Sequence, residues 1–214
     1  MTKTNNSSNT SNIFRKIRKR FGESKAEKLT SSDKNLLIDS EHPNSQHQTP
    51  YYSPDLTNVL FLSKRGLSRA PLAREIMRTL LHFSDLFGGV RPSARGISDA
   101  YEFCPFDKRM VLSAKKFGYD LSGSSRRVNM GELSSANLIV PLDRESEEYT
   151  KSRKFYIRGQ VRPVSMFLPT NHSPYLPDPF DRDELSDNQI NYEEIIRSTE
   201  LACGKLMNYL PALV

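Results

Sequence analysis

Apolar residues in the second part of the chain form short runs that alternate with segments of helical periodicity. Short apolar runs bounded by turn residues are typical of strands, and runs with apolar residues every three or four positions are typical of helices. The expected strands are Val59–Leu62, Val90–Ala94, Asn137–Leu142 and Val161–Met166. The expected helices run from Pro71 to about Phe83, over Phe106–Phe117, from about Arg144, and over Tyr192–Leu210. This alternation predicts an α/β fold with a parallel sheet covered by helices on both faces.

The first 55 residues lack this pattern. They are rich in Asn, Ser, Thr, Lys and Gln, which predicts a disordered tail over residues 1–55 and a folded domain over residues 56–214. The 214-residue chain has a net charge of +6, but nine of its 31 Lys and Arg and five of its 25 Asp and Glu lie in residues 1–50. Because most of the excess charge belongs to the tail, no specific nucleic-acid-binding fold is predicted.

One segment of the tail, Ile13–Phe21, combines five basic residues with four large apolar ones. As a helix it would suit an anionic membrane surface or an acidic partner. A solvated basic tail would have the same composition, and the acid-free start of the chain also has some likeness to a transit peptide. The sequence leaves these alternatives open.

The few cysteines and histidines exclude several kinds of site. Cys104 and Cys203 lie far apart, so neither a disulfide framework nor a cysteine zinc site is expected, and a cytoplasmic location is predicted. We expect both to be small buried residues and not reactive thiols. The four histidines show no metal-ligand spacing, and no apolar run is long enough to cross a bilayer. No metal or cofactor is predicted.

The segment N-V-L-F-L-S-K-R-G-L-S-R-A-P, which begins at Asn58, joins a buried strand to a helix. Backbone N–H groups in such a loop and at the start of the helix favour a bound anion. Gly66 permits a positive φ in the turn, and Arg69 can hold two oxygens of a phosphate. These residues predict a phosphate-binding loop, although an ordinary strand-to-helix turn with a solvent-facing arginine would have the same pattern.

Several segments, in the right order, resemble the low-molecular-weight protein tyrosine phosphatase family. Its C-x5-R-S-P loop after a V-L-F-V strand corresponds to V-L-F-L, Ser63, five residues, Arg69, Ala70 and Pro71. P-S-A-R-G, G-Y-D-L-S-G-S-S-R-R and I-V-P-L-D-R-E resemble three further family segments. L-P-D-P-F, from Leu176, resembles the family's D-P loop, and N-Y-E-E-I-I-R-S-T-E-L-A-C resembles the helix that follows it. The resemblance covers about residues 58–210.

This resemblance implies a three-layer fold with a four-stranded parallel sheet and flanking helices. It also implies a two-step hydrolysis of a phosphomonoester through a phosphocysteine. By position, Arg69 would clamp the phosphate, Asp178 would be the general acid and base, and Phe180 would form an aromatic wall of the pocket. The cradle of backbone N–H groups would be formed by Lys64, Arg65, Gly66, Leu67 and Ser68. The implied ligand is a phosphorylated protein or a small phosphoester.

The sequence departs from the family pattern at the nucleophile, where Ser63 replaces the cysteine. A positive loop can lower the pKa of a thiol below neutrality, but an alcohol needs an adjacent base. His82 falls at the far end of the expected helix, so no histidine is near in sequence. Gly66 and Ala70 replace an asparagine and a serine that support the thiolate in the family, while Lys64 and Arg65 add positive charge to the cradle.

Three functions remain open on the sequence alone. The favoured one is a catalytically impaired phosphatase-like protein that binds phosphate or a phosphorylated partner in the loop from Ser63 to Arg69. The second is an active phosphomonoester hydrolase of unusual mechanism, in which water attacks under Asp178. The third is a non-catalytic scaffold whose loop binds nothing. Asp143, after the third expected strand, is predicted to cap a helix or to pair with a residue near Arg144 and not to act in catalysis.

Overall fold

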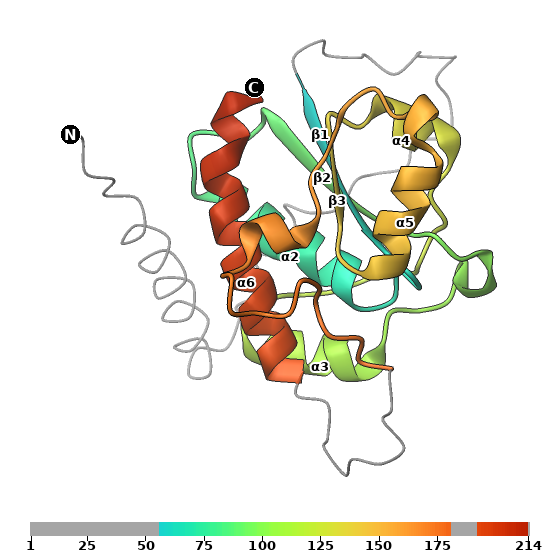
Figure 1. The fold of residues 1–214 in the computed structure, drawn as a ribbon. Coiled ribbons are helices and arrows are strands. Elements are labelled where there is room, and N and C mark those ends of the chain that lie inside the picture. The colour runs from blue at the N-terminus through green and yellow to red at the C-terminus, as the bar shows by residue number, and fades with distance from the viewer. Residues whose placement is uncertain (1–55, 181–191, 214) are drawn as a thin grey trace, which may run out of the picture.

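The computed structural model describes residues 56–180 and 192–213. The predicted disordered tail, including Ile13–Phe21, lies outside the described residues. In this part of the chain a central parallel sheet is flanked by helices (Figure 1). The predicted α/β fold class is therefore confirmed.

The sheet in the described residues has four strands in the order β2-β1-β3-β4. The strands are β1 (Thr57–Ser63), β2 (Val90–Gly96), β3 (Leu138–Pro141) and β4 (Gln160–Val161). All neighbouring strands are parallel, and Val59 pairs with Pro92 on one side and Leu138 on the other. Because β1 lies inside the sheet, six of its seven residues are buried.

The fourth strand is much shorter than predicted. The expected strand Val161–Met166 is replaced by the two residues of β4, after which Val164–Phe167 forms a 3-10 helix. Pro163 lies between the two elements and has no N–H group for a sheet hydrogen bond, which accounts for the early end of the strand. The apolar side chains of Val164 and Phe167 still enter the core.

Helices cover both faces of the sheet (Figure 1). They are α2 (Arg69–His82), α3 (Lys108–Lys116), α4 (Met130–Ser135), α5 (Arg144–Ser152) and α6 (Tyr192–Tyr209), with shorter 3-10 turns at Asp99–Tyr101, Lys154–Tyr156 and Leu210–Ala212. The larger core cluster packs α2, α3 and α6 against Val59 and Phe61 of β1. The smaller cluster joins Leu60 of β1 and Ile139 of β3 to Leu133 of α4. The alternation of side chains along β1 thus supplies both cores.

Helix α4 is an element that the sequence pattern did not predict. It has only six residues, too few for a clear helical period, but it begins with a capping box between Asn129 and Glu132. Within the described residues, no helix combines the length and the apolar character needed to cross a membrane. The fold places the carboxyl ends of β1 and β3 side by side, and the candidate site lies there.

Candidate functional site

The loop from Ser63 to Ser68 makes a tight turn at Gly66. Gly66 has a φ of +69°, which confirms the positive φ predicted from the sequence. A Cβ at this position would lie 2.5 Å from Ser125 Oγ and 2.6 Å from the backbone nitrogen of Gly96. The Ser125 hydroxyl also donates a hydrogen bond to the carbonyl of Arg65 at 2.8 Å. The loop is therefore packed closely against the end of β2 and the segment that contains Ser125.

Helix α2 begins without a side-chain cap. Its N-cap residue, Ser68, makes no capping hydrogen bond, and its hydroxyl donates instead to Asp107 Oδ2 at 3.2 Å. No acidic residue lies in the first turn of α2. The Leu67 side chain is buried, and its carbonyl accepts a hydrogen bond from the Asp107 backbone at 3.0 Å. The positive end of α2 thus has no carboxylate of its own, which favours an anion beside the loop.

Ser63 is the last residue of β1, and its side chain is buried where the loop begins. The residue is 2% exposed, and its Oγ accepts a hydrogen bond from the Gly66 backbone N–H at 3.2 Å. Across residues 56–180 and 192–213, no carboxylate or imidazole forms a hydrogen bond with this hydroxyl. His82 is the last residue of α2, and its ring contacts Phe83 and Phe87. The hydrogen bond from Gly66 is thus the interaction that the described structure gives this hydroxyl.

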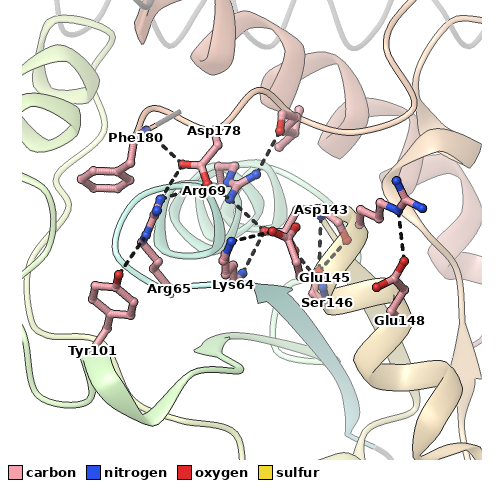
Figure 2. A network of polar contacts seen from close by, with 12 residues as sticks. Lys64, Arg65, Arg69, Tyr101, Asp143, Glu145, Ser146, Glu148, Asp178 and Phe180 are labelled. Atoms are coloured by element: carbon pink, nitrogen blue, oxygen red, sulfur yellow. Dashed lines mark hydrogen bonds and ion pairs between the residues drawn. The ribbon is translucent and has the colours of Figure 1, made fainter. Parts of the chain in front are cut away.

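Arg69, the first residue of α2, is 5% exposed and is held by three acceptors. It donates to the carbonyl of Leu176 at 3.0 Å and to Asp178 Oδ2 at 3.1 Å, and its Nη2 lies 2.9 Å from Asp143 Oδ2. Figure 2 shows the guanidinium between the two carboxylates. A buried arginine held in this way is a fixed positive charge beside the loop.

Asp143 connects the loop to the neighbouring strand-to-helix junction. It is the N-cap of α5, where its Oδ1 accepts a hydrogen bond from the Ser146 backbone at 2.9 Å. Its Oδ2 accepts one from the Lys64 backbone at 2.8 Å in addition to the ion pair with Arg69. The predicted capping role is confirmed, but the charged partner is Arg69 and not a neighbour of Arg144. A buried carboxylate with this many donors is a structural support for the loop.

Arg65 ties the loop to the segment that contains Asp178 and Phe180. Its Nη1 donates to both carboxylate oxygens of Asp178 at 3.0 Å, and its Nε donates to the Tyr101 hydroxyl at 3.3 Å. The guanidinium carbon also lies 4.7 Å from the centre of the Phe180 ring, a cation–π distance (Figure 2). Residues 113 positions apart in sequence are joined directly by this contact.

Lys64 pairs with a carboxylate on the other side of the loop. Its Nζ lies 2.7 Å from Glu145 Oε1, with both side chains partly exposed. The hydrogen bond with Lys64 lowers the pKa of Glu145, and the same bond raises the pKa of Lys64. The cations Lys64, Arg65 and Arg69 therefore face the carboxylates of Asp143, Glu145 and Asp178. The added positive charge expected from the sequence is balanced in the fold.

The chain is matched by the family model for low molecular weight phosphotyrosine protein phosphatase over residues 58–213. The chain belongs to this family. A relative from Synechocystis sp., provisionally named a low molecular weight protein-tyrosine-phosphatase, is 25% identical over 156 residues, which cover 71% of this chain and 95% of the relative. The family model covers the loop, α2 to α6 and all of the sheet except Thr57, the first residue of β1.

Solved structures with the same fold come from several phosphatases. A crystal structure of the protein tyrosine phosphatase from Entamoeba histolytica, with Hepes in the active site, has a TM-score of 0.65 and 21% identity, covering 73% of this chain and 97% of the other. YfkJ from Bacillus subtilis has a TM-score of 0.64 and 20% identity, covering 73% and 96%. The Drosophila arginine phosphatase has a TM-score of 0.61 and 15% identity, covering 71% and 96%.

In this member of the family, the site residues expected from the resemblance lie together. The loop and Arg69 lie beside Asp178 and Phe180, which approach from the segment before α6 (Figure 2). Sequence reasoning missed Tyr101 and Glu145 and did not assign Asp143 to the loop. A signal for Asp143 was present, because it follows the strand beside β1 and so falls at the same edge of the sheet as Arg69.

The two cysteines lie outside this loop. Cys203 is buried in α6, where its Sγ lies 3.7 Å from the Ala73 carbonyl, and burial raises the pKa of its thiol. This confirms the predicted burial of Cys203 in the core. Cys104 is only partly buried, so the prediction that it is a buried residue was wrong. It lies in the irregular segment between the 3-10 turn Asp99–Tyr101 and α3.

Proposed function

We propose that this family member binds a phosphorylated ligand in the loop from Ser63 to Arg69 and does not hydrolyse it. The observation that carries the proposal is the environment of Ser63. Its hydroxyl accepts a hydrogen bond from Gly66 and has no base hydrogen-bonded to it within the described residues, whereas Arg69 is buried at the start of α2. The loop thus retains groups that bind an anion and lacks the group that would activate a nucleophile.

The chemistry of the hydroxyl supports the absence of turnover. A thiol loses its proton near pH 8.5 and a helix start can bring that value lower, whereas an alcohol needs a general base within hydrogen-bonding distance. Asp178 is the carboxylate that the family pattern would use, but both of its oxygens accept hydrogen bonds from arginine. This arrangement suits a held anion better than a proton donor or acceptor.

Binding is supported by the open end of α2 and by Arg69. The first turn of α2 has no acidic residue and no side-chain cap, so its N–H groups favour an external anion. The solved structures of the same fold include a tyrosine phosphatase and an arginine phosphatase. The fold therefore leaves the nature of the phosphorylated group open, and we propose the broad class of phosphorylated proteins and small phosphoesters.

The decisive experiment measures hydrolysis of para-nitrophenyl phosphate by the wild type, Ser63→Cys and Ser63→Ala. We expect no turnover by the wild type or Ser63→Ala and measurable turnover by Ser63→Cys, because a thiolate in an intact cradle restores the missing nucleophile. Turnover by the wild type that is lost in Asp178→Asn would overturn the proposal in favour of an unusual hydrolase. If Ser63→Cys folds but is inactive and the wild type does not bind inorganic phosphate, the scaffold hypothesis replaces it.

A further inference from the structure

The carboxylate of Asp178 accepts hydrogen bonds from the two arginines that an incoming phosphate would need as donors. Arg65 Nη1 donates to both of its oxygens at 3.0 Å, and Arg69 Nη2 donates to Oδ2 at 3.1 Å. Carboxylate and phosphate present similar pairs of oxygens to a guanidinium group, so the two anions compete for the same donors. The side chains of Asp178 and Arg69 are 9% and 5% exposed, so the interaction is largely protected from water.

The carboxylate is fixed in place from several directions. Asp178 Oδ1 also accepts a hydrogen bond from the Phe180 backbone at 3.0 Å. The start of the segment is attached to the sheet, because the Leu176 backbone donates to the Leu142 carbonyl at 3.1 Å. Arg65 completes the arrangement through its contacts with Tyr101 and with the Phe180 ring. The geometry is that of a bound ligand supplied by the chain itself (Figure 2).

We propose that Asp178 is an internal anion of the phosphate site, held there by Arg65, and that a phosphorylated ligand binds only when it displaces this carboxylate. The proposal rests on the proposed function and adds its regulation. A ligand must offset the loss of the Asp178 contacts, so the wild type binds inorganic phosphate more weakly than the donors alone would allow. Removal of the Asp178 charge then strengthens binding, which is the opposite of the effect expected for a supporting residue.

The test is a titration with inorganic phosphate at fixed ionic strength, in which binding is measured by isothermal titration calorimetry. Asp178→Asn and Asp178→Ala are compared with the wild type, and Asp85→Asn is the control for the change in net charge, because Asp85 is exposed and lies beyond the other end of α2. We expect Asp178→Asn to bind phosphate about tenfold more tightly or better, since it removes a like charge and a competitor. Asp85→Asn is expected to match the wild type.

Equal or weaker binding by both Asp178 variants, with clear binding by the wild type, would overturn the internal-anion proposal and leave the proposed function standing. Absence of phosphate binding in the wild type and in both folded Asp178 variants would instead overturn the proposed function. Near-ultraviolet circular dichroism verifies that each variant is folded. The use of two substitutions keeps the test available if one of them does not fold.

A second surface, independent of the loop, lies between α2 and the edge strand β2. It is a groove of about 550 Å³ whose lining includes Arg74, Arg78, Arg91 and Arg95 together with Leu81 and Phe87. We call it the arginine groove. Phe87 is 67% exposed, which is high for a large apolar side chain. Exposed aromatic residues and arginines together are typical of protein-binding surfaces.

The positive charge of the arginine groove is only partly balanced. Arg95 Nε donates to Glu132 at 2.7 Å, and Arg78 lies 3.5 Å from Glu75. Arg91 is exposed on β2, and within the described residues the Nε of Arg74 is buried without a hydrogen-bond partner. Among the described residues, these four guanidinium groups thus share the carboxylates of Glu132 and Glu75, and the groove favours a partner that supplies further acceptors.

We infer that the arginine groove binds an acidic, extended segment of a partner protein that carries an apolar residue. The carboxylates complement the arginines, and the apolar residue suits the contact with Leu81 and Phe87. In the described part of the sheet β1 is the one strand paired with β2, apart from an isolated bridge between Gly96 and Arg127 at the end of β2, and Pro92 lies within β2. A proline removes a backbone donor from the edge, so side chains and not added strand pairing carry the interaction.

The probe is a fluorescently labelled peptide of glutamates around a central leucine, and its glutamine analogue is the uncharged control. Arg78→Glu/Arg91→Glu is compared with Lys154→Glu/Arg158→Glu, which makes the same charge change at exposed positions near β4, the opposite edge of the sheet. We expect the first variant to weaken binding of the acidic peptide about tenfold or more, with the control near wild type. Equal loss in both variants, or tighter binding of a single-stranded oligonucleotide than of the peptide, would overturn the inference.

Discussion

Two neighbouring strands of the sheet, β1 and β3, each end in a short connection to a helix, and the two helices begin differently. At the β3 junction, α5 begins with a capping box in which Asp143 and Ser146 exchange hydrogen bonds, and acidic residues lie in its first turn. At the β1 junction, α2 begins with Ser68, which makes no capping hydrogen bond, and its first turn contains no acidic residue. One helix start is closed by its own carboxylate and the other is not.

The comparison teaches that two strand-to-helix units of one sheet can differ in whether a carboxylate caps the helix, and under the proposed function the uncapped unit is the anion site. Asp143 links the two cases, because one oxygen caps α5 while the other accepts from the Lys64 backbone and pairs with Arg69. The carboxylate that caps α5 therefore also holds the loop before α2. The carboxylate that supports the α2 junction thus belongs to the neighbouring helix, and the first turn of α2 contains no acidic residue.

Substitution of Asp143 would break this comparison with the largest expected effect. Asp143→Ala removes a helix cap and one partner of the buried Arg69, so we expect a loss of about 3–5 kcal/mol in the free energy of unfolding, measured in urea. Asp143→Asn keeps a side-chain oxygen that can cap α5 about as well as aspartate does, and it loses only the charge. It should lie between the alanine variant and the wild type. A loss below about 1 kcal/mol in Asp143→Ala would show that Arg69 is held by its other partners alone.

Gly66 and Gly88 offer a matched pair that sharpens the comparison. Both have a positive φ, of +69° and +86°, but a Cβ on Gly66 would collide with Ser125 and Gly96, whereas a Cβ on Gly88 meets nothing within 4 Å. Gly88→Ala should cost about 1 kcal/mol for the backbone alone, and Gly66→Ala about 2–4 kcal/mol because it adds the collision. Thermal unfolding of both variants provides the measurement. Equal costs would mean that the loop moves freely away from Ser125.

The elements around this comparison differ in how far the sequence predicted them. The apolar runs predicted β1, β2 and β3, and the segment from Asn58 to Pro71 predicted a strand, a turn at Gly66 and a helix, because both signals depend on residues close together in the chain. The fourth strand was predicted too long because Val164 and Phe167 are buried from a 3-10 helix, and burial alone does not separate the two conformations.

The pairing of charges in the site could not be read from the sequence. Arg65 was expected to add positive charge to the loop, but the fold brings Asp178 to it over 113 positions. Whether a cation is free or paired depends on contacts that form only after the chain has folded. For Asp143 the sequence did predict a cap, because a carboxylate between a strand and a helix is a local signal, while its pairing with Arg69 depended on the order of the strands.

The smallest expected effect concerns the pair of Lys64 and Glu145, which joins the two junctions at the surface. The lowered pKa of Glu145 means that its contribution is present above pH 4.5 and is lost as the pH falls through the lower folded value. The raised pKa of Lys64 means that its contribution is present below pH 10.5 and is lost as the pH rises through the higher folded value.

Because the side chains of Lys64 and Glu145 are 41% and 45% exposed, Glu145→Gln should cost only about 0.5 kcal/mol at neutral pH. Urea unfolding at several pH values and salt concentrations tests this, with the exposed Glu102→Gln as the control. The difference from the wild type should fade in high salt and below about pH 4. A difference that persists under both conditions would show that Glu145 acts through packing and not through its charge.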